Sequence, residues 1–146
     1  MKPKQLRTEI QISAPINQVW QVLTDFDHWK DWNPTVKQAG GSASVGSKLS
    51  ISMSGGDCKE MSYQPHVAEA NSPTMFRWRA TMIAGFLFTN DRVFELKEKN
   101  GGTELIHKEE FSGLMVPVFW KKMNQFVVPI LEKMNKALKD KLEASS

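Results

Sequence analysis

The hydrophobic period of the chain changes once, near Gly113, and this change constrains the fold more than any other feature of the sequence. Before Gly113, segments such as residues 49–53 and 76–82 alternate apolar and polar side chains, which is typical of strands with one buried face. After Gly113, apolar residues recur every three or four positions up to Leu142, which predicts one long amphipathic helix. A sheet with one apolar face needs a cover, and this helix is the only long amphipathic element available.

The N-terminal region predicts one strand and two short helices. Residues 6–13 alternate in the manner of a half-buried strand, and Pro15 then stands where the first turn of a helix tolerates a missing N–H group. Residues 26–32 carry an aromatic side chain at every third position and predict a second short helix. That helix should end before Pro34, because the residue preceding a proline avoids the α conformation.

The middle of the chain predicts further antiparallel strands. A weaker strand over residues 61–70 is interrupted by Pro65, which favours an edge position or a bulge because proline cannot donate to a ladder. The sequence Asn-Gly-Gly at residues 100–102 separates strand-like residues 91–97 and 103–111. Glycine readily adopts positive φ angles, so these two strands should form a hairpin.

Pro129 lies inside the predicted final helix, with apolar residues on both sides. Proline has no backbone N–H group to donate, and its ring clashes with the preceding turn. We therefore expect the helix to kink or break near residues 125–126.

Composition and charge fit a single domain over residues 1–146. Hydrophobic residues make up 40% and charged residues 24%, and a formal net charge of +3 is too small to indicate nucleic-acid binding. Cys58 is the single cysteine, so disulfide frameworks and cysteine-based zinc sites are excluded and a reducing compartment is favoured. Neither a secretory signal nor a membrane span is visible, so we expect a cytoplasmic protein without stable membrane insertion.

No motif predicts a catalytic residue, a metal site or a cofactor. Residues 41–48 approach a phosphate-binding loop, but the lysine follows the serine and a strand comes next instead of a helix. The sequence His-Lys-Glu-Glu at residues 107–110 lacks the second histidine of a helical zinc motif.

The hairpin alternation places polar side chains on an apolar face. Arg92 shares the face of Phe94, whereas His107 and Glu109 share the face of Phe111. A hairpin turn at residues 100–102 sets Arg92 opposite Glu109 and Phe94 opposite His107. An unpaired buried charge would cost several kcal/mol, so we predict a contact between Arg92 and Glu109.

Short motifs occur in a fixed order along nearly the whole chain: APINQVWQVLTDF at residues 14–26, WNP at 32–34, FRWR at 76–79, GTEL at 102–105, EFSG at 110–113 and MNKALK at 134–139. Together they resemble the START-like SRPBCC superfamily, which includes polyketide cyclase/dehydrase-like and Bet v-like helix-grip proteins. The resemblance implies an α+β helix-grip fold. In that fold a curved antiparallel sheet of about seven strands wraps around a long C-terminal helix, with two short helices after the first strand.

The resemblance implies binding more than any fixed reaction, because the superfamily holds lipid transporters, hormone receptors and aromatase/cyclases on one scaffold. Some inward positions are polar or small, so we expect a cavity between sheet and helix that takes a hydrophobic or aromatic small molecule or a lipid. Polar groups would orient its head and apolar groups would enclose its body. The expected ligand-binding residues are Trp78, Arg92, Phe94, His107, Glu109, Phe111, Met123, Phe126 and Val127.

Other interpretations stay open. A polyketide cyclase-like enzyme would use His107, Glu109 or Arg92 for proton transfer during aldol closure. An interaction module would use the apolar residues 82–88 and 114–120, which could touch a membrane or another subunit, as in a homodimer. The same polar group could also be a buried structural network that holds strand register.

Overall fold

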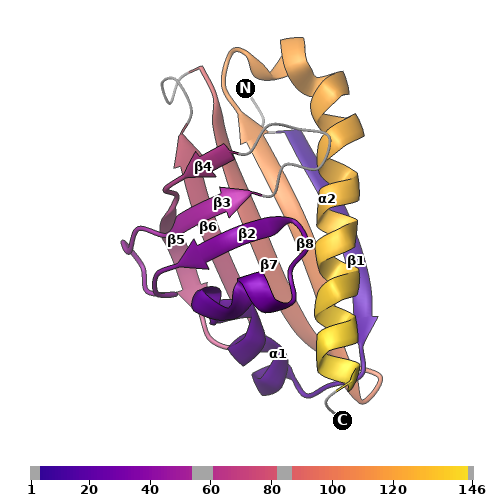
Figure 1. Cartoon of the computed structure of the whole chain (residues 1–146). Helices are drawn as coiled ribbons and strands as arrows, with labels where there is room; N and C mark the ends of the chain where they lie inside the picture. The colour runs from indigo at the N-terminus through magenta and orange to yellow at the C-terminus, as the bar shows by residue number, and fades with distance from the viewer. Residues whose placement is uncertain (1–3, 54–60, 82–86, 145–146) are drawn as a thin grey trace.

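The computed structural model describes residues 4–53, 61–81 and 87–144, and it has the expected α+β helix-grip architecture (Figure 1). Strands and helices follow one another in the predicted order. In chain order they are β1 (Lys4–Ile12), α1 (Ile16–Thr24), the 3-10 helix η1 (Phe26–Asp31), β2 (Val36–Gly40), β3 (Ser50–Met53), β4 (Met61–Tyr63), β5 (His66–Asn71), β6 (Met75–Thr81), β7 (Thr89–Lys99), β8 (Gly102–Ser112) and α2 (Val116–Ala144).

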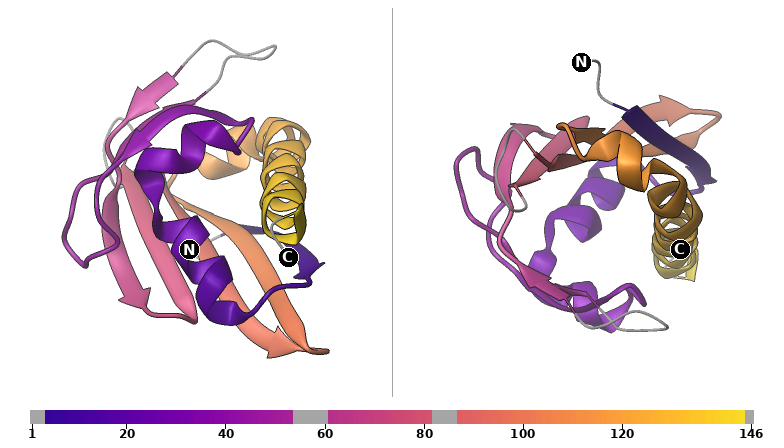
Figure 2. Two further views of the ribbon diagram at one scale, coloured as in Figure 1. Left: turned by 60° about the horizontal axis from the view of Figure 1, so that its bottom comes forward. Right: turned by 90° about the horizontal axis from the view of Figure 1, so that it is seen from above.

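The strands form two antiparallel sheets that meet at the edge of β5. One sheet has five strands in the order β1-β8-β7-β6-β5 and the other has three in the order β2-β3-β4, slightly more than the seven or so expected. Backbone hydrogen bonds from Leu49 to Pro65 (2.8 Å) and from Val67 to Ser47 (2.9 Å) join them. Figure 2 shows that the strands curve around the helices, with α2 lying along the β1–β8 end.

The predicted strand over residues 61–70 is divided at Pro65 into β4 and β5, which lie in different sheets. Strand β5 is an edge strand, as the proline indicated, and β5 also shifts register between Val67 and Glu69. Pro65 has no N–H group to donate, but its carbonyl oxygen accepts the bond from Leu49. The proline therefore marks the point where the chain passes from one sheet to the other.

The turn between β7 and β8 confirms the predicted hairpin and its register. Asn100 and Gly101 both have positive φ angles, 54° and 77°, as a two-residue turn of this kind requires. The register pairs Arg92 with Glu109 and Phe94 with His107. Because side chains alternate along a strand, these residues point toward the concave face. Helix α2 covers this face on the side of β1 and β8.

Aromatic side chains from β6, β7 and η1 form the centre of the core. The Trp29 ring lies 5.8 Å from that of Trp78 and 6.4 Å from that of Phe94, between ring centroids. The indole Nε1 of Trp29 donates to the carbonyl of Leu23 at 3.0 Å, so this buried polar atom is satisfied. Met82, which was expected to extend the inward face of β6, lies outside the described residues, as does Cys58.

A kink or a break was expected near residues 125–126, and helix α2 continues through Pro129 without a break. Its first turns run at an angle to the rest, which Figure 2 shows as the orange and yellow parts of the helix. The two parts also differ in burial: Val116 is the one fully buried residue before Pro129, whereas those after it are Leu131, Met134, Asn135, Leu138 and Leu142. Gln125, whose carbonyl loses its helical donor, is exposed, so water can satisfy that oxygen without a break. None of the described helices combines the length and hydropathy that crossing a membrane requires.

The connection between β8 and α2 provides a test of what positions the helix. Gly113 has φ 120°, and a Cβ atom there would collide with the backbone carbonyl of Leu87. Gly101 has φ 77° but open space around the same position. We expect Gly101→Ala to lower the free energy of unfolding by about 1 kcal/mol, from backbone strain alone. Gly113→Ala should cost at least about 2 kcal/mol more, because backbone must also move. Urea unfolding of both variants measures this, and equal losses would contradict the proposed contact.

Candidate functional site

Arg92 and Glu109 form a buried ion pair between adjacent strands. Arg92 Nη2 lies 3.2 Å from Glu109 Oε2, and both residues are 4% exposed. Asn90 Nδ2 donates to the other carboxylate oxygen at 2.7 Å, so both oxygens of Glu109 are engaged. The predicted contact is confirmed. Pairing and hydrogen bonding are what make two buried charges tolerable, since either one alone would cost several kcal/mol.

The rest of the Arg92 guanidinium has no such partner. Among the described residues, nothing accepts a hydrogen bond from Arg92 Nε or Nη1, nor from Trp78 Nε1. The two side chains are neighbours, with the guanidinium carbon 5.4 Å from the centre of the Trp78 ring. Burial raises the pKa of the Tyr63 hydroxyl on β4, and the charge of Arg92 acts in the opposite direction. Tyr63 is therefore close enough to Arg92 to interact with it electrostatically. Buried hydrogen-bond donors therefore gather at one place on the concave face.

His107 fastens the sheet to α2 through a closed set of hydrogen bonds. The Nδ1 atom of His107 lies 2.8 Å from Oδ1 of Asn135 on α2. Asn135 Nδ2 donates to Thr8 Oγ1 on β1 at 2.8 Å, and the Thr8 hydroxyl donates to the backbone carbonyl of His107 at 2.9 Å. Since the amide of Asn135 turns its donor toward Thr8, its oxygen accepts from His107, and Nδ1 carries the proton. We call these three residues the His107 clasp.

The clasp leaves His107 neutral with one free lone pair. Burial is the main cause that lowers its pKa, to about 3, and the charge of Arg92 lowers it further. The ring stacks on Phe94 at 4.3 Å between centroids. Its Nε2 atom has no hydrogen-bond partner among the described side chains and backbone. His107 thus offers an acceptor near the donors of Arg92.

The apolar residues expected at the site fall into separate groups. Trp78 and Phe94 belong to the aromatic core, whereas Phe111 belongs to a second cluster, against which Met123 and Val127 pack. Phe126 belongs to neither cluster: it is 51% exposed. The structure therefore brings the polar residues together as expected, but it divides the apolar ones between two clusters and leaves Phe126 outside both.

Thr8 and Asn135 were missed by sequence reasoning. Thr8 follows the inward alternation of β1, and Asn135 is a polar residue beside the apolar stripe of the final helix. Each signal alone is weak, because a single polar residue on an apolar face is common. Only the fold shows that they meet, since they are 127 positions apart in the chain.

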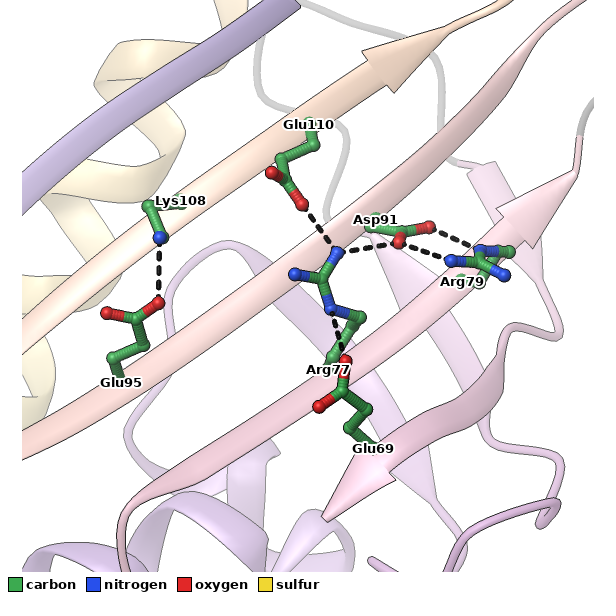
Figure 3. A network of polar contacts seen from close by, with 7 residues as sticks. All are labelled: Glu69, Arg77, Arg79, Asp91, Glu95, Lys108 and Glu110. Carbon is green, nitrogen blue, oxygen red and sulfur yellow. Dashed lines mark hydrogen bonds and ion pairs between the residues drawn. The ribbon is translucent and has the colours of Figure 1, made fainter. Parts of the chain in front are cut away.

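The opposite face of the sheet carries a different polar network, which Figure 3 shows. Arg77 Nη1 donates to Asp91 Oδ2 at 2.8 Å and also to Glu110, and Arg79 Nε donates to Asp91 Oδ1 at 2.8 Å. Burial by itself raises the pKa of Asp91, but the hydrogen bonds from Arg79 and Arg77 outweigh it and hold that pKa below its ordinary value. A shallow hollow of about 390 Å³ lies over these residues. Its charges largely satisfy one another, unlike the donors on the concave face.

The neutral state of His107 predicts a measurable pH dependence of stability. Its pKa is about 3 in the folded chain, below the ordinary value of 6.5, so the unfolded chain binds the proton first as pH falls. The contribution of neutral His107 to the free energy of unfolding is therefore complete above about pH 6.5. It is lost progressively as the pH falls from there to about 3. From about pH 7.5 to about pH 5 the wild-type protein should lose about 2 kcal/mol more than His107→Asn, which retains a donor for Asn135 but does not titrate. Urea unfolding at both pH values measures the difference, and parallel losses in the two proteins would contradict a buried neutral His107.

Solved structures with the same fold differ widely from this chain in sequence. The chain superposes with a TM-score of 0.80 and 9% identity on the di-domain ARO/CYC StfQ from the steffimycin biosynthetic pathway, covering 99% of this chain and 52% of that one. It thus spans about half the length of that di-domain protein. A START superfamily protein from Mycobacterium smegmatis gives 0.78 and 16%, covering 97% and 99%. Ara h 8.0201 gives 0.75 and 14%, also covering 97% and 99%. At these identities the likeness shows the fold alone.

Sequence comparison identifies the family. No curated protein sequence matches the chain. The sequence profile of the family described as "polyketide cyclase / dehydrase and lipid transport" does match, over residues 3–143. This match covers nearly the whole chain and confirms the resemblance found in the ordered motifs. The chain therefore belongs to the polyketide cyclase/dehydrase and lipid transport family.

Proposed function

We propose that the chain binds a hydrophobic or aromatic small molecule, or a lipid, between the concave face of the sheet and α2. The observation that carries this proposal is the pair of neighbouring buried side chains, Arg92 and Trp78, whose donors lack partners among the described residues. A buried donor without an acceptor costs about 1–3 kcal/mol, and native proteins retain few of them. An acceptor oxygen on a bound molecule would satisfy these donors.

The helix offers apolar surface for the body of such a molecule. Asn135 and Lys139 bond to β1, so they mark the flank of α2 that faces this strand. At 3.6 residues per turn, Phe126 and Ile130 lie about half a turn away, on the other flank. Neither is fully buried, and Phe126 belongs to neither hydrophobic cluster. This flank supports contact with an apolar ligand that enters beside the helix.

The enzymatic alternative receives less support from the same residues. A general acid or base works best with a pKa near the pH at which the reaction runs. His107 has a pKa of about 3, which makes it a weak base, and Nδ1 is held by Asn135. Both carboxylate oxygens of Glu109 accept hydrogen bonds from Arg92 and Asn90. The arrangement favours holding a ligand over moving its protons.

A neutral fluorescent probe tests the apolar flank. N-phenyl-1-naphthylamine should bind the wild-type protein saturably, with one molecule per chain. Phe126→Asp should weaken binding about ten-fold or more, because an apolar ring would have to desolvate a carboxylate. Gln125→Asp places the same charge one residue away, on the exposed side of the helix, and should leave binding unchanged. Failure of the probe to saturate, or equal effects of the two variants, would contradict the proposal.

A second pair of probes tests the polar end of the site. Trp78→Phe removes the indole donor and retains an aromatic ring. Prodan, whose carbonyl is an acceptor, should bind this variant about five-fold more weakly, which corresponds to one lost hydrogen bond. N-phenyl-1-naphthylamine has no carbonyl, so its smaller loss measures the change in packing alone. If both probes lose affinity equally, Trp78 does not donate to the ligand.

Native mass spectrometry of gently purified protein would identify a molecule that remains bound.

A further inference from the structure

The exposed apolar residues of the protein concentrate at the start of α2. Large hydrophobic side chains with high exposure are Leu114 (62%), Val118 (76%), Phe119 (40%) and Phe126 (51%), and among the described residues only Val45 adds to them elsewhere. Soluble proteins rarely expose a contiguous group of this kind without a partner for it. Leu114, Val118 and Phe119 lie within six consecutive residues; Leu114 precedes α2, and neither Val118 nor Phe119 is among the buried residues of the helix.

Positive charge surrounds these residues, and negative charge is missing from their segment. Lys121 and Lys122 are exposed on the same turns of α2, and no aspartate or glutamate occurs from Gly113 to Leu131. The Nζ atom of Lys4 lies 5.2 Å from the centre of the Trp120 ring, which adds a third lysine at this end. After Leu131 the helix carries both signs of charge, with three acidic residues among four lysines.

We propose that this apolar-basic face, formed by Leu114, Val118, Phe119, Lys121 and Lys122, docks on an anionic lipid surface. Apolar side chains flanked by lysines are the pattern with which helices lie in the membrane interface, where the rings and aliphatic groups enter the acyl boundary and the ammonium groups meet phosphates. Each lysine near an anionic membrane contributes about 1 kcal/mol. The docking does not require the proposed ligand site, so it goes beyond ligand binding.

A second copy of the chain is the rival occupant of this face. A two-fold dimer brings the same patch of each protomer together, so Lys121 and Lys122 would face their own counterparts. No acidic residue of the same segment is available to compensate this repulsion. A lipid surface rich in phosphate fits the charge of the face, and a second copy does not.

Vesicle binding by the full chain tests the proposal. Flotation should recover the protein with phosphatidylcholine vesicles that contain about 30% phosphatidylglycerol, but not with phosphatidylcholine alone, and about 0.5 M NaCl should weaken binding. The double variant Lys121→Gln/Lys122→Gln should bind about thirty-fold more weakly, at about 1 kcal/mol per lysine. Leu114→Ser/Val118→Ser should also weaken binding, by removing the inserted groups.

The matched control is Lys133→Gln/Lys136→Gln. It makes the same change in net charge on the same side of the same helix, beyond Pro129, and should leave vesicle binding unchanged within about two-fold. All the substituted residues are exposed or precede the helix, so unchanged melting temperatures would show that each variant folds. Equal losses in the two lysine variants would overturn the proposal in favour of a general charge effect. Wild-type protein that ignores anionic vesicles would also overturn it, as would a dimer in light scattering that Leu114→Ser/Val118→Ser dissociates. None of these outcomes depends on the fluorescent probes, so failure here is distinguishable from failure of the ligand proposal.

Discussion

The concave face of the five-stranded sheet must be covered, and most of the structure follows from how this is done. At one end α1, η1 and the second half of α2 cover it with a continuous apolar core. The His107 clasp fixes the helix there, because Asn135 joins it to β1 and β8 together. Toward the other end the first half of α2 contributes one buried residue, Val116, and exposes apolar and basic side chains. One helix therefore has two parts: its second half is buried against the core, and its first half leaves apolar and basic side chains exposed.

The two faces of the sheet differ in how completely their charged groups are hydrogen-bonded. On the outer face, Arg77, Arg79 and Asp91 share hydrogen bonds near solvent, so no single contact there needs a ligand (Figure 3). On the concave face, Arg92 and Glu109 neutralise each other, yet the guanidinium retains donors that no described residue accepts. Low polarity makes such unsatisfied donors costly. The ligand that we propose, an apolar molecule with an acceptor oxygen, would satisfy these donors.

Much of this site could be predicted from local patterns. Alternation placed Arg92 and Glu109 on the inward face, and the Asn-Gly-Gly turn set their register, because a hairpin turn leaves few ways to pair two strands. The continuity of α2 could not be predicted in this way. Whether a helix breaks at Pro129 depends on whether water reaches the freed carbonyl, and this is decided by what packs around the helix.

The amino-acid sequence alone therefore determined the order of the elements, the pairing of β7 with β8 and the polar character of the interior, since each follows from neighbours along one or two strands. Only the tertiary structure decided that Thr8 and Asn135 complete the surroundings of His107, and that Phe126 lies half exposed while Val127 packs inward. These facts depend on how closely segments that are distant in the chain approach each other, and on the rotation of one helix about its axis. Both are set by packing over the whole domain, which no local pattern records.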